Sequence, residues 1–195
     1  MRARFASFAV VLAALLGGTL AGARPVPDTG LPPKSIHMAL GNPSAAKSDG
    51  ADKTNFLMRK TYFALSYNNA KGTPNWVSWY LSAEFLGKAK RKPSFDPDDE
   101  LLDGFTRITH RDYTNSGFQR GHMCPHSDRA ADQDMSFATF VMTNVVPQSA
   151  ECNEGSWESL EAYCRYLVKV KGKELFVVAG PIGKGGEGEH GVKQT

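Results

Sequence analysis

A histidine, an asparagine and a glutamate follow one another in the second half of the sequence at spacings that could gather them around one phosphate ester. His122 lies two residues after Arg120, Asn153 follows a short apolar stretch, and Glu161 comes eight residues later. A neutral histidine can make an attacking water basic near pH 7. Amide and carboxylate oxygens suit a hard cation such as Mg²⁺, and a guanidinium meets charge on phosphoryl oxygens. These residue types point to metal-assisted cleavage of a phosphodiester bond.

Two short strands are expected to carry the first part of this set. Residues 118–123 read as a strand that runs into a turn at Pro125, and residues 140–146 as an apolar strand that ends at Pro147. Cleavage requires the base and the metal to be held by rigid elements. A strand–loop–strand–helix unit meets this requirement, with the base on the first strand.

The remaining residues fall on a predicted helix. After Asn153, apolar residues recur at helical spacing through residues 156–170. Asn153 is expected to act as the N-cap of this helix. Glu161 and Arg165 are four residues apart and therefore share one side of it. Taken alone, such a pair is usually only a surface ion pair worth about 0.3–0.5 kcal/mol.

The rest of the chain predicts an α+β domain with an antiparallel sheet. Residues 61–67 alternate in hydrophobicity and residues 75–82 are rich in aromatic and β-branched types, with the turn sequence NNAKGTP between them, which indicates a β-hairpin. Residues 174–179 read as a final buried strand. Trp76 and Trp79 are expected to pack in the core, and residues 88–103 form a long polar loop.

The first residues resemble a secretory signal peptide. Arg2 and Arg4 precede an apolar run, and Ala23 ends a small-x-small cleavage site. The run is short for a membrane-spanning helix, which needs about 20 residues. We therefore expect cleavage after Ala23 and a secreted or periplasmic protein without membrane attachment. Residues 24–53 are expected to form an extended arm that joins the domain near His37, residues 54–183 the domain, and residues 184–195 a flexible tail.

Composition limits the kind of partner. Removing 23 of the 195 residues leaves 172, which suits one domain. The remaining 21 Lys+Arg against 20 Asp+Glu give a net charge near +1, so binding to a polyanion requires a local patch. The dense basic cluster is Lys88, Lys90, Arg91 and Lys92. A charge run of this kind is usually a solvated face.

Three cysteines are an odd number for an exported protein and allow at most one intrachain disulfide. Cys124 lies close in sequence to the candidate base, and Cys152 precedes Asn153 directly. A Cys124–Cys152 bridge is one expectation and a Cys124–Cys164 bridge is the other. The sequence has no CxxC pair, which argues against a structural zinc site.

Several of these motifs together resemble one family. Gln119-Arg120-Gly121-His122-Met123 is followed by Asn144-Val145-Val146-Pro147-Gln148 and then by Asn153, Trp157 and Leu160-Glu161. This order is similar to that of the DNA/RNA non-specific endonucleases, which are ββα-metal (His-Me finger) enzymes and include endonuclease G. The resemblance extends from about His37 to Gly183.

The resemblance implies a role for each residue. His122 would be the general base, Asn153 the one direct protein ligand of Mg²⁺, and Glu161 a residue that orients metal-bound water. Mn²⁺ is an expected substitute for Mg²⁺, DNA and RNA are the expected partners, and no small-molecule cofactor is expected. Arg120 would lie near the scissile phosphate as a catalytic residue, and Arg165 would be catalytic beside Glu161. The resemblance further implies that substrate is bound by Arg91, Arg120 and Arg129. Asn144 and Gln119 would support the site.

Two features differ from the family pattern and keep alternatives open. The family motif usually begins with Asp, where this chain has Gln119, whose amide keeps a hydrogen bond but not the negative charge. The family domain usually continues past this C-terminus, so a fragment or a truncated protein is one expectation. The second functional hypothesis is therefore a weak or inactive nucleic-acid-binding module of the same fold. A third is a zinc hydrolase that would use His126 and Asp128 beside His122.

Overall fold

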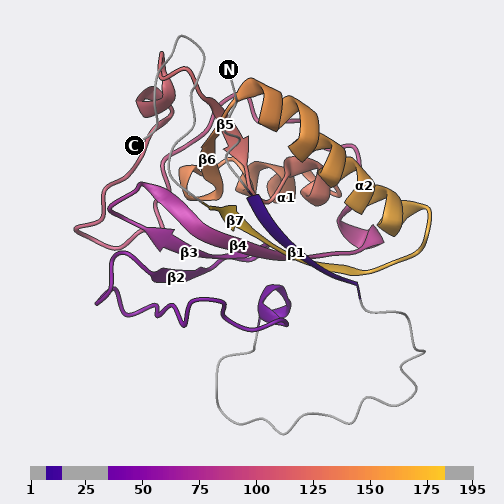
Figure 1. Ribbon diagram of the computed structural model, residues 1–195, viewed down its shortest axis with the longest axis horizontal. Coiled ribbons are helices and arrows are strands. Elements are labelled where there is room, and N and C mark those ends of the chain that lie inside the picture. Colours follow the sequence, from indigo (N-terminus) through magenta and orange to yellow (C-terminus); the bar gives the residue numbers. More distant parts are fainter. Residues whose placement is uncertain (1–7, 15–34, 183–195) are drawn as a thin grey trace, which may run out of the picture.

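The computed structural model describes residues 35–182 with their side chains and residues 8–14 by their backbone only (Figure 1). Most of the expected signal peptide, the first part of the arm and the expected tail lie outside the described residues. Within them, the chain folds as an α+β domain, as the sequence predicted. No helix in the described ranges is both long enough and apolar enough to span a membrane.

A five-stranded antiparallel sheet forms the base of the domain, in the order β1-β7-β4-β3-β2. The predicted hairpin is confirmed as β3 and β4, and the predicted last strand as β7. The strands of this sheet are β1 (Phe8–Ala14), β2 (Phe56–Arg59), β3 (Ala64–Asn68), β4 (Thr73–Leu81) and β7 (Leu175–Pro181).

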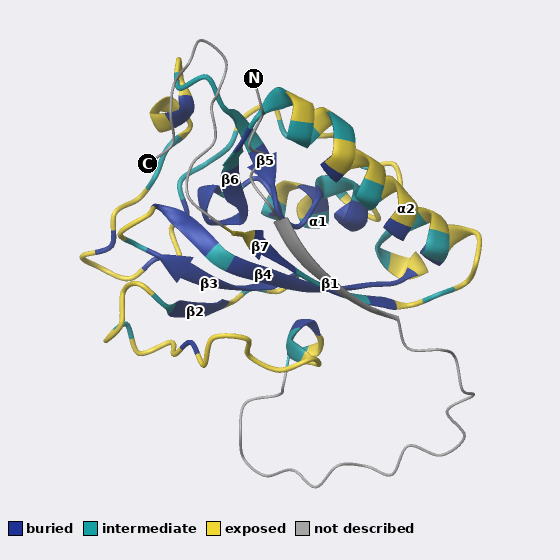
Figure 2. Ribbon diagram, in the orientation of Figure 1, coloured by how far each residue is buried: buried dark blue, intermediate teal, exposed yellow. Residues whose placement is uncertain are grey.

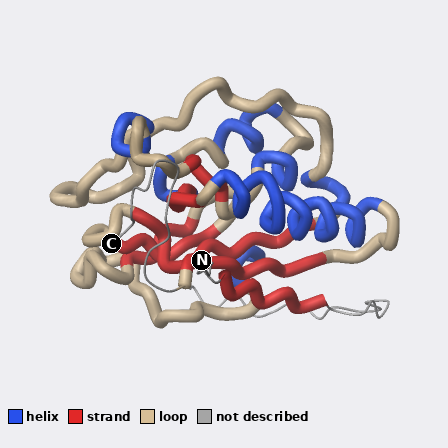
Figure 3. Tube along the Cα trace, turned by 45° about the horizontal axis from the view of Figure 1, so that its top comes forward, coloured by secondary structure: helices blue, strands red, loops and turns tan. Residues whose placement is uncertain are grey.

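A smaller unit packs on one face of this sheet. Figure 1 shows α2 and the β5–β6 pair on that face, and Figure 3 shows the helices gathered on the same side of the strands. The two-stranded sheet is β5 (Gln119–His122) with β6 (Val145–Gln148), and the helices are α1 (Gln133–Ala138) and α2 (Glu158–Lys169). Short helical turns complete the chain: η2 (Ala83–Phe85), η3 (His110–Tyr113), η4 (His126–Arg129), η5 (Met142–Asn144) and the π-helical η6 (Cys152–Trp157). The turn η1 (Ile36–Met38) lies on the opposite face of the sheet, where Met38 packs against Trp76 (Figure 1).

The predicted second strand is placed wrongly by the sequence pattern. We expected residues 140–146, but β6 begins at Val145 and includes Pro147. The reason is that the Asn144 N–H bonds to the Val141 carbonyl at 2.9 Å, which closes a turn before the strand starts. Pro147 is tolerated because β6 pairs only with β5 and its other edge needs no donor.

The core lies between the five-stranded sheet and α2. Because side chains alternate along a strand, Val77 and Trp79 of β4 face α2, where they share a core with Trp157 and Cys164. Trp76 faces the opposite side and packs with Leu57 in a smaller cluster. Figure 2 shows the resulting buried sheet. Trp76 and Trp79 are 5% and 3% exposed, so the predicted core roles of both tryptophans are confirmed.

His37 fastens the N-terminal segment to the sheet, near the point where we expected the arm to join. Its backbone carbonyl accepts the Ser78 hydroxyl at 2.6 Å, Nε2 lies 3.0 Å from the Thr61 carbonyl, and Nδ1 accepts the Tyr80 N–H at 3.2 Å. These partners fix the neutral tautomer with the proton on Nε2. Burial lowers the pKa of His37 to about 4.

The apolar run near the N-terminus forms β1, which pairs with β7 along its whole length. This run is the segment that we assigned to a signal peptide. Cleavage after Ala23 would remove β1 and leave β7 as the edge strand of the sheet.

All three cysteines are free thiols, so neither expected disulfide is present. Cys124 and Cys164 lie in the main core, and Cys152 packs against it. Burial raises the pKa of Cys124 to about 12 and that of Cys164 to about 11, which favours the thiol. These side chains therefore serve as small apolar packing groups.

Candidate active site

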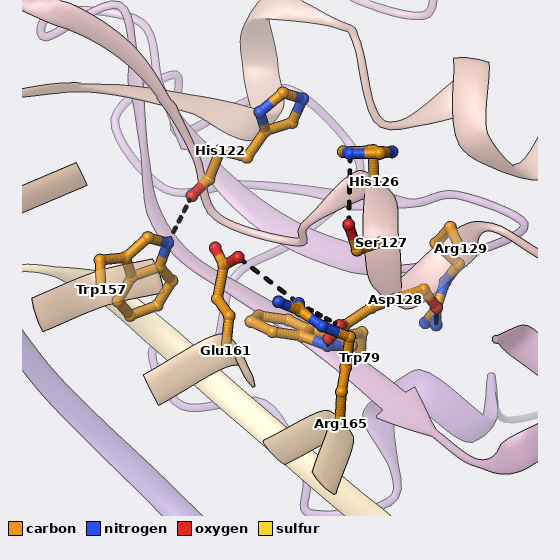
Figure 4. Close-up of polar contacts among 9 residues, drawn as sticks. All are labelled: Trp79, His122, His126, Ser127, Asp128, Arg129, Trp157, Glu161 and Arg165. Carbon is orange, nitrogen blue, oxygen red and sulfur yellow. Dashed lines mark hydrogen bonds and ion pairs between the residues drawn. The ribbon is translucent and has the colours of Figure 1, made fainter. Parts of the chain in front are cut away.

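His122 ends β5 and is 8% exposed. Its ring lies between Phe95 and Phe140, with centroid distances of 4.8 and 4.7 Å. Its backbone carbonyl accepts the Trp157 indole N–H at 3.1 Å, which ties β5 to the start of α2 (Figure 4). Its Nε2 is buried without a hydrogen-bond partner in the structure. The strand thus presents a fixed imidazole with one uncommitted nitrogen.

Two neighbours reinforce the neutral form of this histidine. Burial, followed by the charge of Arg91 and then that of His126, lowers the pKa of His122 to about 3. The Arg91 guanidinium lies 5.4 Å from the centroid of the Phe140 ring, and the His126 ring lies 5.9 Å from the same centroid. The long loop therefore brings Arg91 to the histidine that the sequence singled out. A neutral imidazole beside a cation can accept a proton while a phosphate is held nearby.

Asn153 does not cap a helix, which corrects the sequence-based expectation. It lies inside η6, whose π-helical turn precedes α2. Its side-chain Nδ2 donates to Gln119 Oε1 at 2.6 Å, and Gln119 Nε2 donates to Glu154 Oε1. Single π-helical turns are frequent at functional sites because the wider turn re-aims side chains. Here the turn directs Asn153 back to β5.

Glu161 and Arg165 form the ion pair that their spacing predicted, at 3.5 Å. The Glu161 carboxylate is 16% exposed. Burial, and after it the charge of Asp128, raises the pKa of Glu161 to about 8, although Arg165 opposes the shift. The carboxyl is therefore under-compensated, and an additional cation nearby would stabilise its charged form.

The donor set fits a hard divalent cation. Asn153 bonds to Gln119 through Nδ2, and within the described part of the chain no donor is bonded to its Oδ1. Glu161 adds a carboxylate whose negative charge is not fully compensated by the neighbouring Arg165. Both are oxygen donors, and few protein oxygens are typical of Mg²⁺, which keeps several waters. Asn153 and Glu161 would hold such an ion, directly and through water.

Asp128 joins the site to the core, a role that the sequence did not reveal. Its Oδ1 accepts the Arg165 Nη1 at 3.0 Å, and its Oδ2 accepts the Trp79 indole N–H at 2.9 Å (Figure 4). Asp128 is 1% exposed, so its two partners satisfy a buried carboxylate. Arg165 is therefore held between Asp128 and Glu161.

Asn144 clamps the backbone directly after the histidine. Its Oδ1 accepts the Cys124 N–H, and its Nδ2 donates to the carbonyls of Cys124 and Thr139, all at 2.9 Å. Asn144 is fully buried. Asn144 ends η5, one residue before β6, so it lies outside the second strand from which it was expected to act. From there it fixes the exit of β5.

Arg129 was expected to bind substrate, and the structure corrects this expectation. The side chain is 0% exposed, and its guanidinium donates to the carbonyls of Tyr62, Tyr80 and Asp128. It also lies 4.4 Å from the centroid of the Phe85 ring. A guanidinium with this many buried partners stabilises the fold and cannot reach a nucleic acid.

Arg120 lies on the same strand as His122 but turns toward η3. Its Nη2 donates to the His110 carbonyl at 2.6 Å, and its Nε is buried without a partner in the structure. The structure thus brings Arg120 only to the edge of the site.

Gln148 belongs to a motif that the sequence analysis singled out, but the sequence assigned it no role. It is 2% exposed, and neither of its amide atoms has a partner in the structure. It lies over Gly121, where an added Cβ would be 1.7 Å from its Oε1. The position before His122 therefore requires glycine.

The described residues offer no cluster of ligands for the zinc ion of the third hypothesis. Among residues 8–14 and 35–182, no group of three or more His, Cys, Asp or Glu side chains could hold a metal ion. Both carboxylate oxygens of Asp128 are engaged by Trp79 and Arg165, and His126 Nε2 contacts Ser127 at 3.2 Å.

Comparison with known proteins shows the family of this chain. Residues 40–194 match the family model described as DNA/RNA non-specific endonuclease, and the chain belongs to this family. A nuclease of Nostoc sp. is 44% identical over 180 residues, which cover 92% of this chain and 65% of the relative. The human mitochondrial nuclease EXOG is 37% identical over 124 residues, or 63% of this chain and 33% of the relative.

A solved structure shares the fold. The EndoG chain of the EndoG/EndoGI complex superposes with a TM-score of 0.65 at 27% identity, covering 82% of this chain and 62% of that chain. This chain therefore spans at most about two thirds of the length of these relatives.

Proposed function

We propose that this protein is a Mg²⁺-dependent endonuclease that hydrolyses phosphodiester bonds of DNA and RNA without sequence specificity. The observation that carries the proposal is His122, a neutral histidine with an uncommitted buried nitrogen beside Arg91. Family membership and the nuclease names of the relatives support the reaction class. Mn²⁺ is expected to substitute for Mg²⁺.

His122 would remove a proton from the attacking water. The water oxygen forms a bond to phosphorus, the bond between phosphorus and the leaving oxygen breaks, and the proton passes to the imidazole. Its low pKa keeps His122 unprotonated before the attack, and binding of an anionic phosphate beside it would raise that pKa. The base would thus strengthen when substrate arrives.

The cationic side chains would meet the phosphate charge. Arg91 is exposed on the loop beside His122, which suits contact with the nucleic-acid backbone. Arg165 is held in place by Asp128 and compensates the charge of Glu161 only in part. A bound Mg²⁺ would supply Lewis-acid stabilisation of the leaving oxygen. Asn153 and Glu161 would orient oxygen donors toward it.

A binding module without activity is the alternative, because Gln119 lacks the charge of an aspartate. The contact between Gln119 Oε1 and Asn153 Nδ2 favours the active enzyme, since the residue still orients the asparagine. We also propose that the protein is exported after cleavage at Ala23. N-terminal sequencing of protein recovered outside the cytoplasm should then begin at Arg24, and an intact Met1 there would contradict export by cleavage.

Digestion of plasmid DNA and of RNA with different ions tests the proposal. Mg²⁺ and Mn²⁺ should support cleavage of both, and EDTA should abolish it. Cleavage should weaken steeply with salt, because phosphate contacts release counterions. Binding of DNA without any cleavage in Mg²⁺ or Mn²⁺ would favour the binding module, and cleavage only in Zn²⁺ would favour the zinc hydrolase.

A further inference from the structure

Three side chains form a directional relay behind the candidate metal ligand. Glu154 Oε1 accepts Gln119 Nε2 at 2.5 Å, and Gln119 Oε1 accepts Asn153 Nδ2 at 2.6 Å. Gln119 comes from β5, while Asn153 and Glu154 are adjacent in η6. The relay thus connects the strand of the base with the turn of the metal ligand.

The order of donors in this relay follows from the charge at its end. An ionised carboxylate only accepts hydrogen bonds, so it requires the NH₂ group of Gln119 to face it. Gln119 then presents its carbonyl oxygen to Asn153, and Asn153 must present its own NH₂ group. This arrangement leaves Asn153 Oδ1 as the atom directed to a cation. Asn153 Oδ1 stays available for the cation because Asn153 bonds to Gln119 through its NH₂ group.

Glutamine alone cannot impose this order. Its amide has a donor end and an acceptor end of nearly equal size, and either end can face Asn153. If Gln119 turned over, its NH₂ group would face Asn153 and would attract Asn153 Oδ1, which would withdraw the metal-binding oxygen. An aspartate at position 119 could only accept and would orient Asn153 without help. Gln119 needs a second group to fix its direction.

We propose that Glu154 is a positioning residue that sets the direction of the Gln119 amide and thereby reserves Asn153 Oδ1 for the divalent cation. The inference rests on the proposed metal-dependent nuclease function. Glu154 is exposed, so its charge is screened and its direct attraction for the ion is weak. Its effect therefore passes through the hydrogen bond to Gln119.

Three single variants separate this relay from a general charge effect. Glu154→Ala removes the acceptor, Glu154→Gln retains an acceptor oxygen without charge, and Glu151→Ala removes a nearby exposed carboxylate that does not contact Gln119. Mn²⁺ binding is measured by calorimetry without nucleic acid, and the Mg²⁺ half-saturation of plasmid nicking is measured beside it. Thermal melting checks that each variant is folded.

We expect Glu154→Ala to raise both metal constants, the Kd for Mn²⁺ and the Mg²⁺ concentration at half-saturation, about 10-fold. This is the lower end of the range for residues that orient metal ligands. Glu154→Gln should recover only part of the loss, because its amide can present either end to Gln119 and fixes the direction less strictly than a carboxylate. Glu151→Ala should behave like the parent. The maximal rate at saturating Mg²⁺ should change little, because the relay acts on the ion and not on His122.

The Gln119→Asp background gives the decisive comparison. Aspartate orients Asn153 by itself, so Glu154→Ala should no longer weaken metal binding there and should relieve repulsion between two carboxylates. If Glu154→Ala weakens metal binding equally in both backgrounds, this inference is overturned while the proposed function stands. The same holds if the parent nicks DNA and Glu154→Ala leaves both metal constants unchanged. A parent that neither nicks DNA nor binds Mn²⁺ would overturn the proposed function and this inference with it.

Discussion

At the scale of single residues, burial decides whether Arg91 and Arg129 can contact a nucleic acid. Arg91 is exposed on a loop and lies beside the ring of Phe140 and the candidate base. Arg129 is enclosed and donates to three carbonyls. The first is free to meet a polyanion, while the second holds together segments that are distant in sequence.

This difference predicts opposite consequences of substitution. Arg91→Ala should reduce nucleic-acid affinity and lower the slope of log affinity against log salt by about 1, because one phosphate contact is lost. Lys88→Ala, which removes an exposed charge from the same loop, serves as the control and should change the affinity less. Binding is measured with uncleaved DNA in EDTA across a salt series. An Arg91 variant with the parental affinity and slope would reject the phosphate contact.

Arg129→Met should instead lower the melting temperature. Each buried carbonyl left without a donor costs about 1–3 kcal/mol, so the loss should be large. Where the variant remains folded, its catalysis at saturating substrate should stay near that of the parent. A stable variant that has lost DNA affinity would restore the substrate-binding role that the sequence suggested.

At the scale of elements, regular periodicity was sufficient for some segments and misleading for others. The hairpin of β3 and β4 and the helix α2 were predicted because their patterns repeat with periods of two and of about 3.6 residues. β2 was missed because three of its four residues are buried, which leaves little alternation. The apolar residues before Val145 looked like a strand because tertiary packing buries a turn there.

The site was predictable where its residues lie in contiguous motifs. His122, Asn153 and Glu161 each stand in a recognisable local context. Asp128 and Glu154 gain their roles only from partners 35 or more residues away, and no local pattern encodes such contacts. The π-helical turn at Asn153 was also hidden, because one extra residue per turn leaves the flanking helical pattern intact.

At the scale of the whole molecule, three neutral histidines, two buried and one half-buried, should make the fold sensitive to acid. The pKa values of His37, His122 and His126 are lowered to about 4, 3 and 4, chiefly by burial. In the unfolded chain a histidine has a pKa of about 6.5. These groups therefore contribute stability above pH 6.5, and that contribution is lost as the pH falls toward 4.

Glu161 acts in the opposite direction. Its pKa is raised to about 8 in the fold, so its contribution is fully present below its unfolded value and is lost as the pH rises through about 8. Burial also raises the pKa of Asp128, and these two carboxyls do not offset three histidines between pH 6.5 and pH 4. Melting temperatures measured in EDTA should fall across this interval, and a flat or rising profile would contradict the buried neutral histidines.

The central claim is that His122 is the general base of a metal-dependent phosphodiester hydrolase. Its most direct test is the rate of plasmid nicking in saturating Mg²⁺ by the parent and by His122→Ala. General bases contribute roughly 10²–10⁴-fold to rate, so the variant should lose at least about 100-fold while it keeps its melting temperature and its Mn²⁺ binding. A folded, metal-binding His122→Ala protein that nicks plasmid at the parental rate would contradict the account.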